Sequence, residues 1–184
     1  ETNWTCPIGS QCEAPGERIL ITGCSGFLGA YLLAGQLERW PELRVSCLVR
    51  AQSKENGLDR IKNNLAHYDL WNPSWEKRLE PIVGDLSLPS FGLDSDVFEK
   101  IAHGLGGVLH NGAQLSQMAS YAQLAASNVG GTREVLRLAT LESPIRVELI
   151  SSVSVFEAAA YRNRVISEED DLKDWHGIYI GYSQ

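Results

Sequence analysis

The feature that most constrains the fold of this chain is a short apolar run followed by three evenly spaced glycines. The run, Ile19–Ile21, is short enough for a buried strand, and Gly23, Gly26 and Gly29 follow it at every third position. Apolar residues at helical spacing then begin at Phe27. A strand, a glycine turn and a helix in this order form the context in which glycines bind a dinucleotide pyrophosphate.

Each glycine has a predicted role in that context. Gly23 allows the tight turn, Gly26 lets the backbone approach a pyrophosphate, and Gly29 lets the helix pack close to the strand. The start of the helix offers N–H groups and a positive dipole end to the phosphates. The alternative is a plain strand–turn–helix, but three glycines in this arrangement favour the cofactor.

Composition and charge narrow the class of protein. The chain has 184 residues, of which 43% are hydrophobic and 21% charged, so we expect a soluble globular domain. A net charge of −7 without a basic run argues against nucleic acid and anionic membranes as partners. The N-terminus lacks the apolar core of a signal peptide, and no apolar run reaches membrane length, so a cytoplasmic location is expected.

The four cysteines have no metal-binding spacing, and no metal site is predicted. Reduced thiols are the simplest account of Cys24 and Cys47, which lie in the glycine turn and in a predicted strand. A disulfide between Cys6 and Cys12 stays open if the compartment is oxidising.

Alternation of strands and helices predicts an α/β fold. It is a Rossmann-type doubly wound parallel sheet with strand order 3-2-1-4-5. Residues 1–16 read as a linker from an upstream domain, and residues 17–184 as the Rossmann domain. After the first strand, the predicted strands are Arg44–Arg50, Leu79–Val83, Gly107–His110 and Arg146–Ile150; the predicted helices start at Phe27 and cover 53–67, 94–103 and 121–141.

The last of these helices contains two features that need an explanation. Gly130 and Gly131 interrupt it, at a cost of about 1 kcal/mol each against Ala, so another part of the chain is expected to approach closely. Asn128 lies on or beside the buried face, where we expect it to tie loops together.

The residue that ends the second strand predicts which cofactor is bound. An acidic residue there would bind the adenine ribose 2′-hydroxyl of NAD, whereas this strand ends in Arg50, which suits the 2′-phosphate of NADP. Arg60, in the next helix, is a candidate for a second cation on that phosphate, with an ordinary surface charge as the equal alternative.

Other candidates follow the ends of the later strands. Asp85 fits either a hydrogen bond from the adenine amino group or a turn. The small residues Asn111–Ala113 would let the backbone lie against the cofactor ribose. His110 is more often structural than a catalytic base at such a strand end, and Gln114, Leu115 and Met118 are positional candidates for the acyl entrance.

These stretches together resemble the terminal thioester reductase domains of nonribosomal peptide and polyketide synthetases. This group of extended short-chain dehydrogenase/reductases includes carboxylic acid reductases and aminoadipate reductases. The shared stretches are Ile21–Gly29, Cys47–Ala51, Gly84–Leu86, His110–Ala113, Asn128–Thr132, Ser151–Phe156 and Gly181–Tyr182.

The resemblance implies an NADP-dependent oxidoreductase. It would release an acyl or peptidyl thioester from the phosphopantetheine arm of a carrier protein, as an aldehyde or alcohol. Ser152 and Tyr182 would be catalytic, because hydroxyl donors stabilise the negative charge that builds on the carbonyl oxygen. The implied cofactor contacts are Thr22, Gly23, Ser25, Gly26, Phe27, Leu28, Gly29, Arg50, Arg60, Asp85, Leu86, Asn111, Gly112 and Ala113.

The sequence departs from the family pattern at its end. The family motif is Tyr-x-x-x-Lys, but the chain stops two residues after Tyr182. We therefore expect a domain truncated before its C-terminal substrate-binding region and inactive by itself. Two alternatives stay open: an extended-family epimerase or reductase acting on a nucleotide sugar or another small carbonyl substrate, and a non-catalytic NADP-binding module. Arg50 speaks against the epimerase, which would hold NAD.

Overall fold

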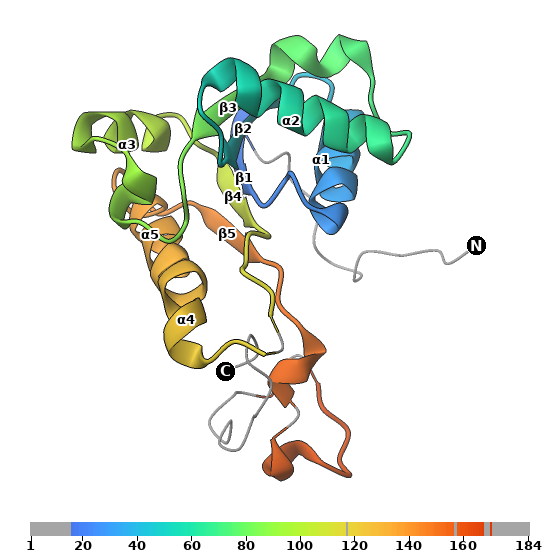
Figure 1. Ribbon diagram of the computed structural model, residues 1–184, viewed down its shortest axis with the longest axis vertical. Coiled ribbons are helices and arrows are strands. Elements are labelled where there is room, and N and C mark those ends of the chain that lie inside the picture. The colour runs from blue at the N-terminus through green and yellow to red at the C-terminus, as the bar shows by residue number, and fades with distance from the viewer. Residues whose placement is uncertain (1–15, 117, 157, 168–169, 171–184) are drawn as a thin grey trace.

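A five-stranded parallel sheet forms the centre of the computed structural model, which describes residues 16–116, 118–156, 158–167 and 170 (Figure 1). Its strands lie in the order β3-β2-β1-β4-β5, and all neighbouring pairs are parallel. This confirms the predicted fold and strand order. The strands are β1 (Arg18–Thr22), β2 (Arg44–Val49), β3 (Leu79–Val83), β4 (Gly107–His110) and β5 (Arg146–Leu149).

Helices cover both faces of the sheet, as the doubly wound fold requires. Figure 1 shows α1 (Phe27–Arg39) and α2 (Lys54–His67) on one side, and α3 (Ser95–Ala102) and α5 (Gly131–Leu138) on the other. Alternation within β1 explains the two layers, because Ile19 and Ile21 pack toward α1 and α2 while Leu20 packs toward α3 and α5. Both layers are therefore hydrophobic cores.

The helix predicted over 121–141 is three segments. They are α4 (Tyr121–Ala125), a π-helical turn (Ala126–Gly130) and α5. The predicted close approach occurs at Gly131, where a Cβ would lie 2.9 Å from the carbonyl oxygen of Leu86; at Gly130 it would meet only an ordinary contact of 3.6 Å. Leu124 and Val135 are buried, whereas Tyr121 and Leu136 are exposed. The π-turn separates α4 from α5, which a single helical period does not anticipate.

The buried cysteines are free thiols, as predicted for Cys24 and Cys47. A hydrogen bond with Cys24, together with burial, raises the pKa of the Cys47 thiol well above its usual value, so Cys47 is protonated at neutral pH. Cys6, Cys12 and nearly all of the predicted linker lie outside the described residues.

Two features are absent from the described residues. No helix there has both the length and the apolar character to cross a membrane. The same residues hold no cluster of three or more His, Cys, Asp or Glu side chains suited to a metal ion.

Candidate functional site

The glycine turn between β1 and α1 is packed too tightly for side chains at two of its three glycines. Gly23 has a φ of +71°, and a Cβ there would lie 2.8 Å from Cα of Gly112. A Cβ on Gly29 would lie 2.0 Å from the Gly23 carbonyl oxygen. Gly29 therefore lets α1 start directly against the turn, rather than against the strand. At Gly26 a Cβ would make only an ordinary contact, at 3.4 Å, so Gly26 is free to face a ligand.

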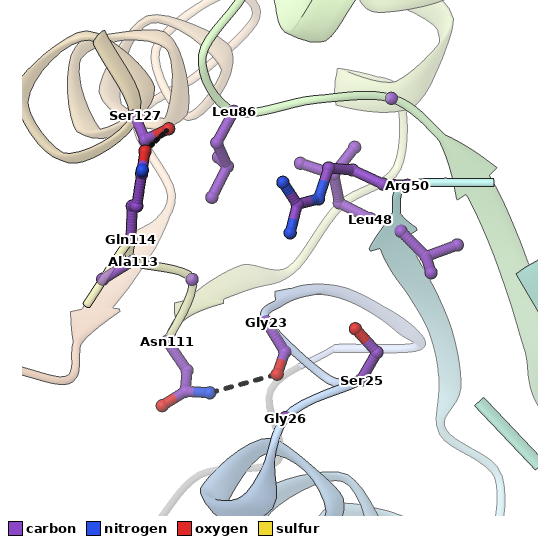
Figure 2. Close-up of a pocket in the computed structure, with 13 residues that line it drawn as sticks. Gly23, Ser25, Gly26, Leu48, Arg50, Leu86, Asn111, Ala113, Gln114 and Ser127 are labelled. Carbon is purple, nitrogen blue, oxygen red and sulfur yellow. Dashed lines mark hydrogen bonds between the residues drawn. The ribbon is translucent and has the colours of Figure 1, made fainter. Parts of the chain in front are cut away.

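Two cavities open at the carboxyl edge of the sheet, on either side of the loop after β4. The first, of about 220 Å³, lies between the glycine turn and the ends of β2 and β3 (Figure 2). It is smaller than most ligand pockets, which hold about 300–1,000 Å³. The second cavity shares Asn111, Gly112 and Ala113 with it, so an elongated ligand would span both. The first is lined by Gly23, Ser25, Gly26, Leu48, Val49, Arg50, Gly84, Leu86, Asn111, Gly112, Ala113, Gln114 and Ser127.

Arg50 supplies a positive charge to the first cavity. It follows β2 directly, and Figure 2 shows its guanidinium extending into the opening, across from the glycine turn. Arg60, on α2, donates a hydrogen bond from Nη1 to the Arg50 carbonyl oxygen at 2.9 Å. Arg60 thus lies beside Arg50, but among the described residues it is not part of the cavity lining.

The loop after β3 separates the roles of its two candidate residues. Oδ1 of Asp85 accepts hydrogen bonds from the backbone N–H of Ser87 at 2.8 Å and from its hydroxyl at 2.7 Å. The backbone bond is the main reason that the pKa of Asp85 is lowered, so the carboxylate is ionised and shapes a turn. Leu86 lines the first cavity, but Asp85 is not in that lining. The contacts of Asp85 thus match the turn alternative.

His110 is buried and links β4 to Thr22 at the end of β1 and to Thr132 in α5. Thr132 donates its hydroxyl proton to the Asn128 carbonyl oxygen at 2.6 Å, so it can only accept the bond that links it to His110 Nε2 at 3.1 Å. The network therefore assigns the proton of the neutral imidazole to Nε2. His110 Nδ1 then accepts from the Thr22 hydroxyl at 2.7 Å. Burial lowers the pKa of His110 to about 4, which keeps the ring neutral.

The Thr22 side chain links the glycine turn to the loop after β4. Its side chain is fully buried and lines neither cavity. Its oxygen accepts a hydrogen bond from the backbone N–H of Gly112 at 2.8 Å, while its proton goes to His110. Thr22 therefore holds the glycine turn and the loop after β4 together beside the first cavity, whose lining includes Gly23 and Gly112.

The π-turn carries Asn128 to the loop after β4. Asn128 Oδ1 accepts from the Gln114 backbone N–H at 2.7 Å, and its Nδ2 donates to the Gln114 carbonyl oxygen at 3.1 Å. This confirms that Asn128 ties loops together. The same turn places Ser127 in the first cavity, opposite the glycine turn. Asn111 completes the connection with a bond from Nδ2 to the Gly23 carbonyl oxygen at 3.3 Å (Figure 2).

The second cavity, of about 520 Å³, is the candidate substrate site. Ser152 lines it, and its Oγ accepts a bond from the Ser154 N–H at 3.2 Å. Of the positional candidates for the acyl entrance, Leu115 lines this cavity, Gln114 lines the first one instead, and Met118 lines neither. Tyr182 lies outside the described residues. The lining is Phe27, Leu28, His110, Asn111, Gly112, Ala113, Leu115, Asn128, Thr132, Leu149, Ile150, Ser151, Ser152 and Val155.

Comparison with known proteins places this geometry in a family. An NAD-binding family described as "Male sterility protein" matches residues 21–184, most of the chain. The chain belongs to this family. A relative named as a reductase matches the sequence, and a solved terminal R domain matches the fold, so the resemblance to terminal reductase domains is confirmed.

Three similar proteins illustrate the match. One of the linear gramicidin synthase subunits of Brevibacillus parabrevis is 36% identical over 91% of this chain and 3% of its own length. The L-2-aminoadipate reductase large subunit of Penicillium chrysogenum is 33% identical, over 90% of this chain and 13% of its own. The terminal R domain of the myxalamid PKS-NRPS pathway is 37% identical with a TM-score of 0.84, over 91% of this chain and 42% of that one. The chain thus spans less than half of each.

Proposed function

We propose that this chain is the NADPH-binding part of a thioester reductase. The observation that carries the proposal is Arg50, whose guanidinium enters the first cavity from the end of β2. That position is where dinucleotide-binding folds distinguish a 2′-hydroxyl from a 2′-phosphate. A guanidinium forms a charge-assisted, bidentate contact with phosphate, which favours NADPH.

The residues around the first cavity fit this cofactor. Gly26 leaves room for the pyrophosphate, and the N–H groups of the first turn of α1 have no acceptors within the helix. NADPH supplies the hydride when it is bound. Asn111, Gly112 and Ala113 lie between the two cavities, where the ribose beside the reacting carbonyl would rest.

The second cavity supplies the groups that act on the substrate. Ser152 would donate a hydrogen bond to the thioester carbonyl oxygen as negative charge builds on it. Tyr182, by the family pattern, would donate a second hydrogen bond and then a proton. The carbonyl carbon gains a hydride, the oxygen gains a proton, and the hemithioacetal then releases the thiol of the carrier arm and an aldehyde, which a second reduction would convert to the alcohol.

The names of the relatives support the substrate class. One relative is named as a linear gramicidin synthase subunit, and a solved one as the terminal R domain of a PKS-NRPS biosynthetic pathway. We propose that the substrate arrives on a phosphopantetheinyl carrier domain of the same polypeptide. The apolar residues Phe27, Leu28 and Leu149 in the second cavity suit an acyl chain.

The cofactor test compares the dissociation constants of NADPH and NADH for the intact protein. We expect tighter binding of NADPH, and Arg50→Ala should weaken it by about 10- to 100-fold, the size of a lost charge-assisted hydrogen bond, while leaving NADH unchanged. Arg44→Ala is the matched control because Arg44 begins β2, at the opposite edge of the sheet. Equal affinities for the two cofactors would remove Arg50 from this role.

The activity test loads a carrier protein with an acyl thioester and adds NADPH to the intact protein. Mass spectrometry should detect released aldehyde or alcohol, and Tyr182→Phe and Ser152→Ala should each abolish most of that release. Tight NADPH binding without release would refute the reductase and leave the binding module standing.

A further inference from the structure

A side chain of helix α2, Asn64, forms hydrogen bonds with the glycine turn. The amide nitrogen of Asn64 donates to the Cys24 carbonyl oxygen at 3.1 Å and to the Gly26 carbonyl oxygen at 3.0 Å. These two carbonyls flank Ser25, and Ser25 and Gly26 both line the first cavity. One half-buried side chain from a distant helix therefore holds two peptide groups of the turn.

The direction of a carbonyl determines the direction of the next N–H. In a planar trans peptide the C=O and the following N–H point to opposite sides, and the described residues contain no cis peptide bond. Asn64 holds the Cys24 oxygen toward α2, so the N–H group of Ser25 points away from α2. The Gly26 oxygen also accepts from the Ala30 N–H at 3.1 Å, so Asn64 and the first turn of α1 together set the direction of the Phe27 N–H. Ser25 lines the first cavity and Phe27 the second. The geometry thus prepares backbone donors for an anion.

Close packing sets the position of α2 relative to β2. Gly57 lies against the sheet so closely that a Cβ would be 2.9 Å from Cγ1 of Val49. Arg60, three residues on, donates to the Arg50 carbonyl oxygen, and Asn64 follows at the spacing that keeps all three on one helix face. The same face of α2 therefore contacts both the end of β2 and the glycine turn.

We infer that Asn64 is a positioning residue for pyrophosphate binding. It holds the glycine turn in the conformation that presents N–H groups to the pyrophosphate and does not itself touch the cofactor. This role rests on the proposed function, because it assumes that a dinucleotide occupies the two cavities. It differs from the role of Arg50, which concerns only the 2′-phosphate.

The test compares two ligands on the intact protein by isothermal titration calorimetry. NADPH contains the pyrophosphate, whereas 2′-AMP carries the 2′-phosphate without it. Asn64→Ala should weaken NADPH by about tenfold, which corresponds to one or two lost hydrogen bonds, and should leave 2′-AMP within about twofold. Asn64→Asp, which replaces the donor by an acceptor at constant volume, should weaken NADPH further.

Asn63→Ala is the matched control, because it makes the same chemical change as Asn64→Ala but at an exposed position of the same helix. We expect Asn63→Ala to bind both ligands like the natural protein. Unchanged NADPH binding in both Asn64 variants would overturn the inference. Equal weakening of NADPH and 2′-AMP would also overturn it, since the effect would then be a general loss of the β2–α2 region.

The outcome for the natural protein separates this inference from the proposed function. If it binds NADH more tightly than NADPH, the cofactor assignment fails, and the inference is tested with NADH against adenosine, which has no phosphate. If it binds neither dinucleotide, both fail together.

Discussion

At the scale of single residues, His110 links stability to pH. The pKa of His110 is lowered to about 4 by burial, so the unfolded chain binds a proton at higher pH than the folded one. The contribution of His110 to the free energy of unfolding should therefore be constant above pH 6.5. As the pH falls from 6.5 to 4, the free energy of unfolding should decrease by about 3 kcal/mol. Urea unfolding across this range measures the slope.

The variant His110→Gln should flatten that slope, because glutamine does not titrate but keeps a donor and an acceptor. His103→Gln is the control, since His103 is exposed and contacts only Glu142 among the ion pairs of the described residues. An unchanged slope in His110→Gln would assign the pH dependence to other groups.

The Thr22 hydroxyl makes a second prediction at this scale. Thr22→Val keeps the shape of the side chain but leaves the Gly112 N–H and the His110 Nδ1 without their present partner. Because both groups are buried, the free energy of unfolding should fall by about 1–3 kcal/mol. Thr140→Val removes an exposed hydroxyl, which donates to the Leu136 and Arg137 carbonyl oxygens, and should cost less. Equal losses in denaturant titrations would count against the buried network.

At the scale of elements, two glycines of α1 should respond to alanine in opposite directions. A Cβ on Gly29 would overlap the Gly23 carbonyl oxygen, so Gly29→Ala must push the helix away from the turn. A Cβ on Gly35 would meet no atom of the described residues within 4 Å. Gly35→Ala should therefore raise the free energy of unfolding by about 0.5–1 kcal/mol through helix propensity.

The measurement for this pair is chemical unfolding together with NADPH titration. Gly29→Ala should lower stability and weaken NADPH, whereas Gly35→Ala should leave NADPH binding intact. A Gly29→Ala protein that binds NADPH normally would show that the turn and α1 need not touch as closely as they do here.

At the scale of the whole molecule, the first cavity depends on four of the five strands and on a helical turn. Its lining comes from the ends of β1, β2, β3 and β4 and from the π-turn. A ligand that binds only when these segments are assembled stabilises the folded state by mass action, by about 2.7 kcal/mol at 100 times its dissociation constant.

NADPH should therefore raise the melting temperature of the intact protein more than NADH does at the same concentration. In Arg50→Ala the two shifts should become equal. Thermal unfolding with each cofactor checks this, and a larger shift with NADH in the natural protein would contradict the assignment of NADPH.

Local patterns in the sequence determined the sheet and one wall of the site. Strand order, the positions of Gly23 and Gly29, and Arg50 at the end of β2 follow from short-range periodicity and from the rule that parallel strands end at one edge. Gly131 was predictable as a point of close approach, because a glycine inside a helix needs a compensating reason. Its partner, Leu86, was not.

Tertiary structure alone decided how the site is supported. Asn64 lies 40 residues from Cys24, and Thr22 lies 88 residues from His110, so no local pattern pairs them. The π-turn also brings Asn128 against the loop after β4 and Ser127 to the first cavity, contacts that no local pattern reveals. A sequence shows which side chains can donate or accept a hydrogen bond, but only the packed sheet and helices bring a particular donor within reach of its acceptor.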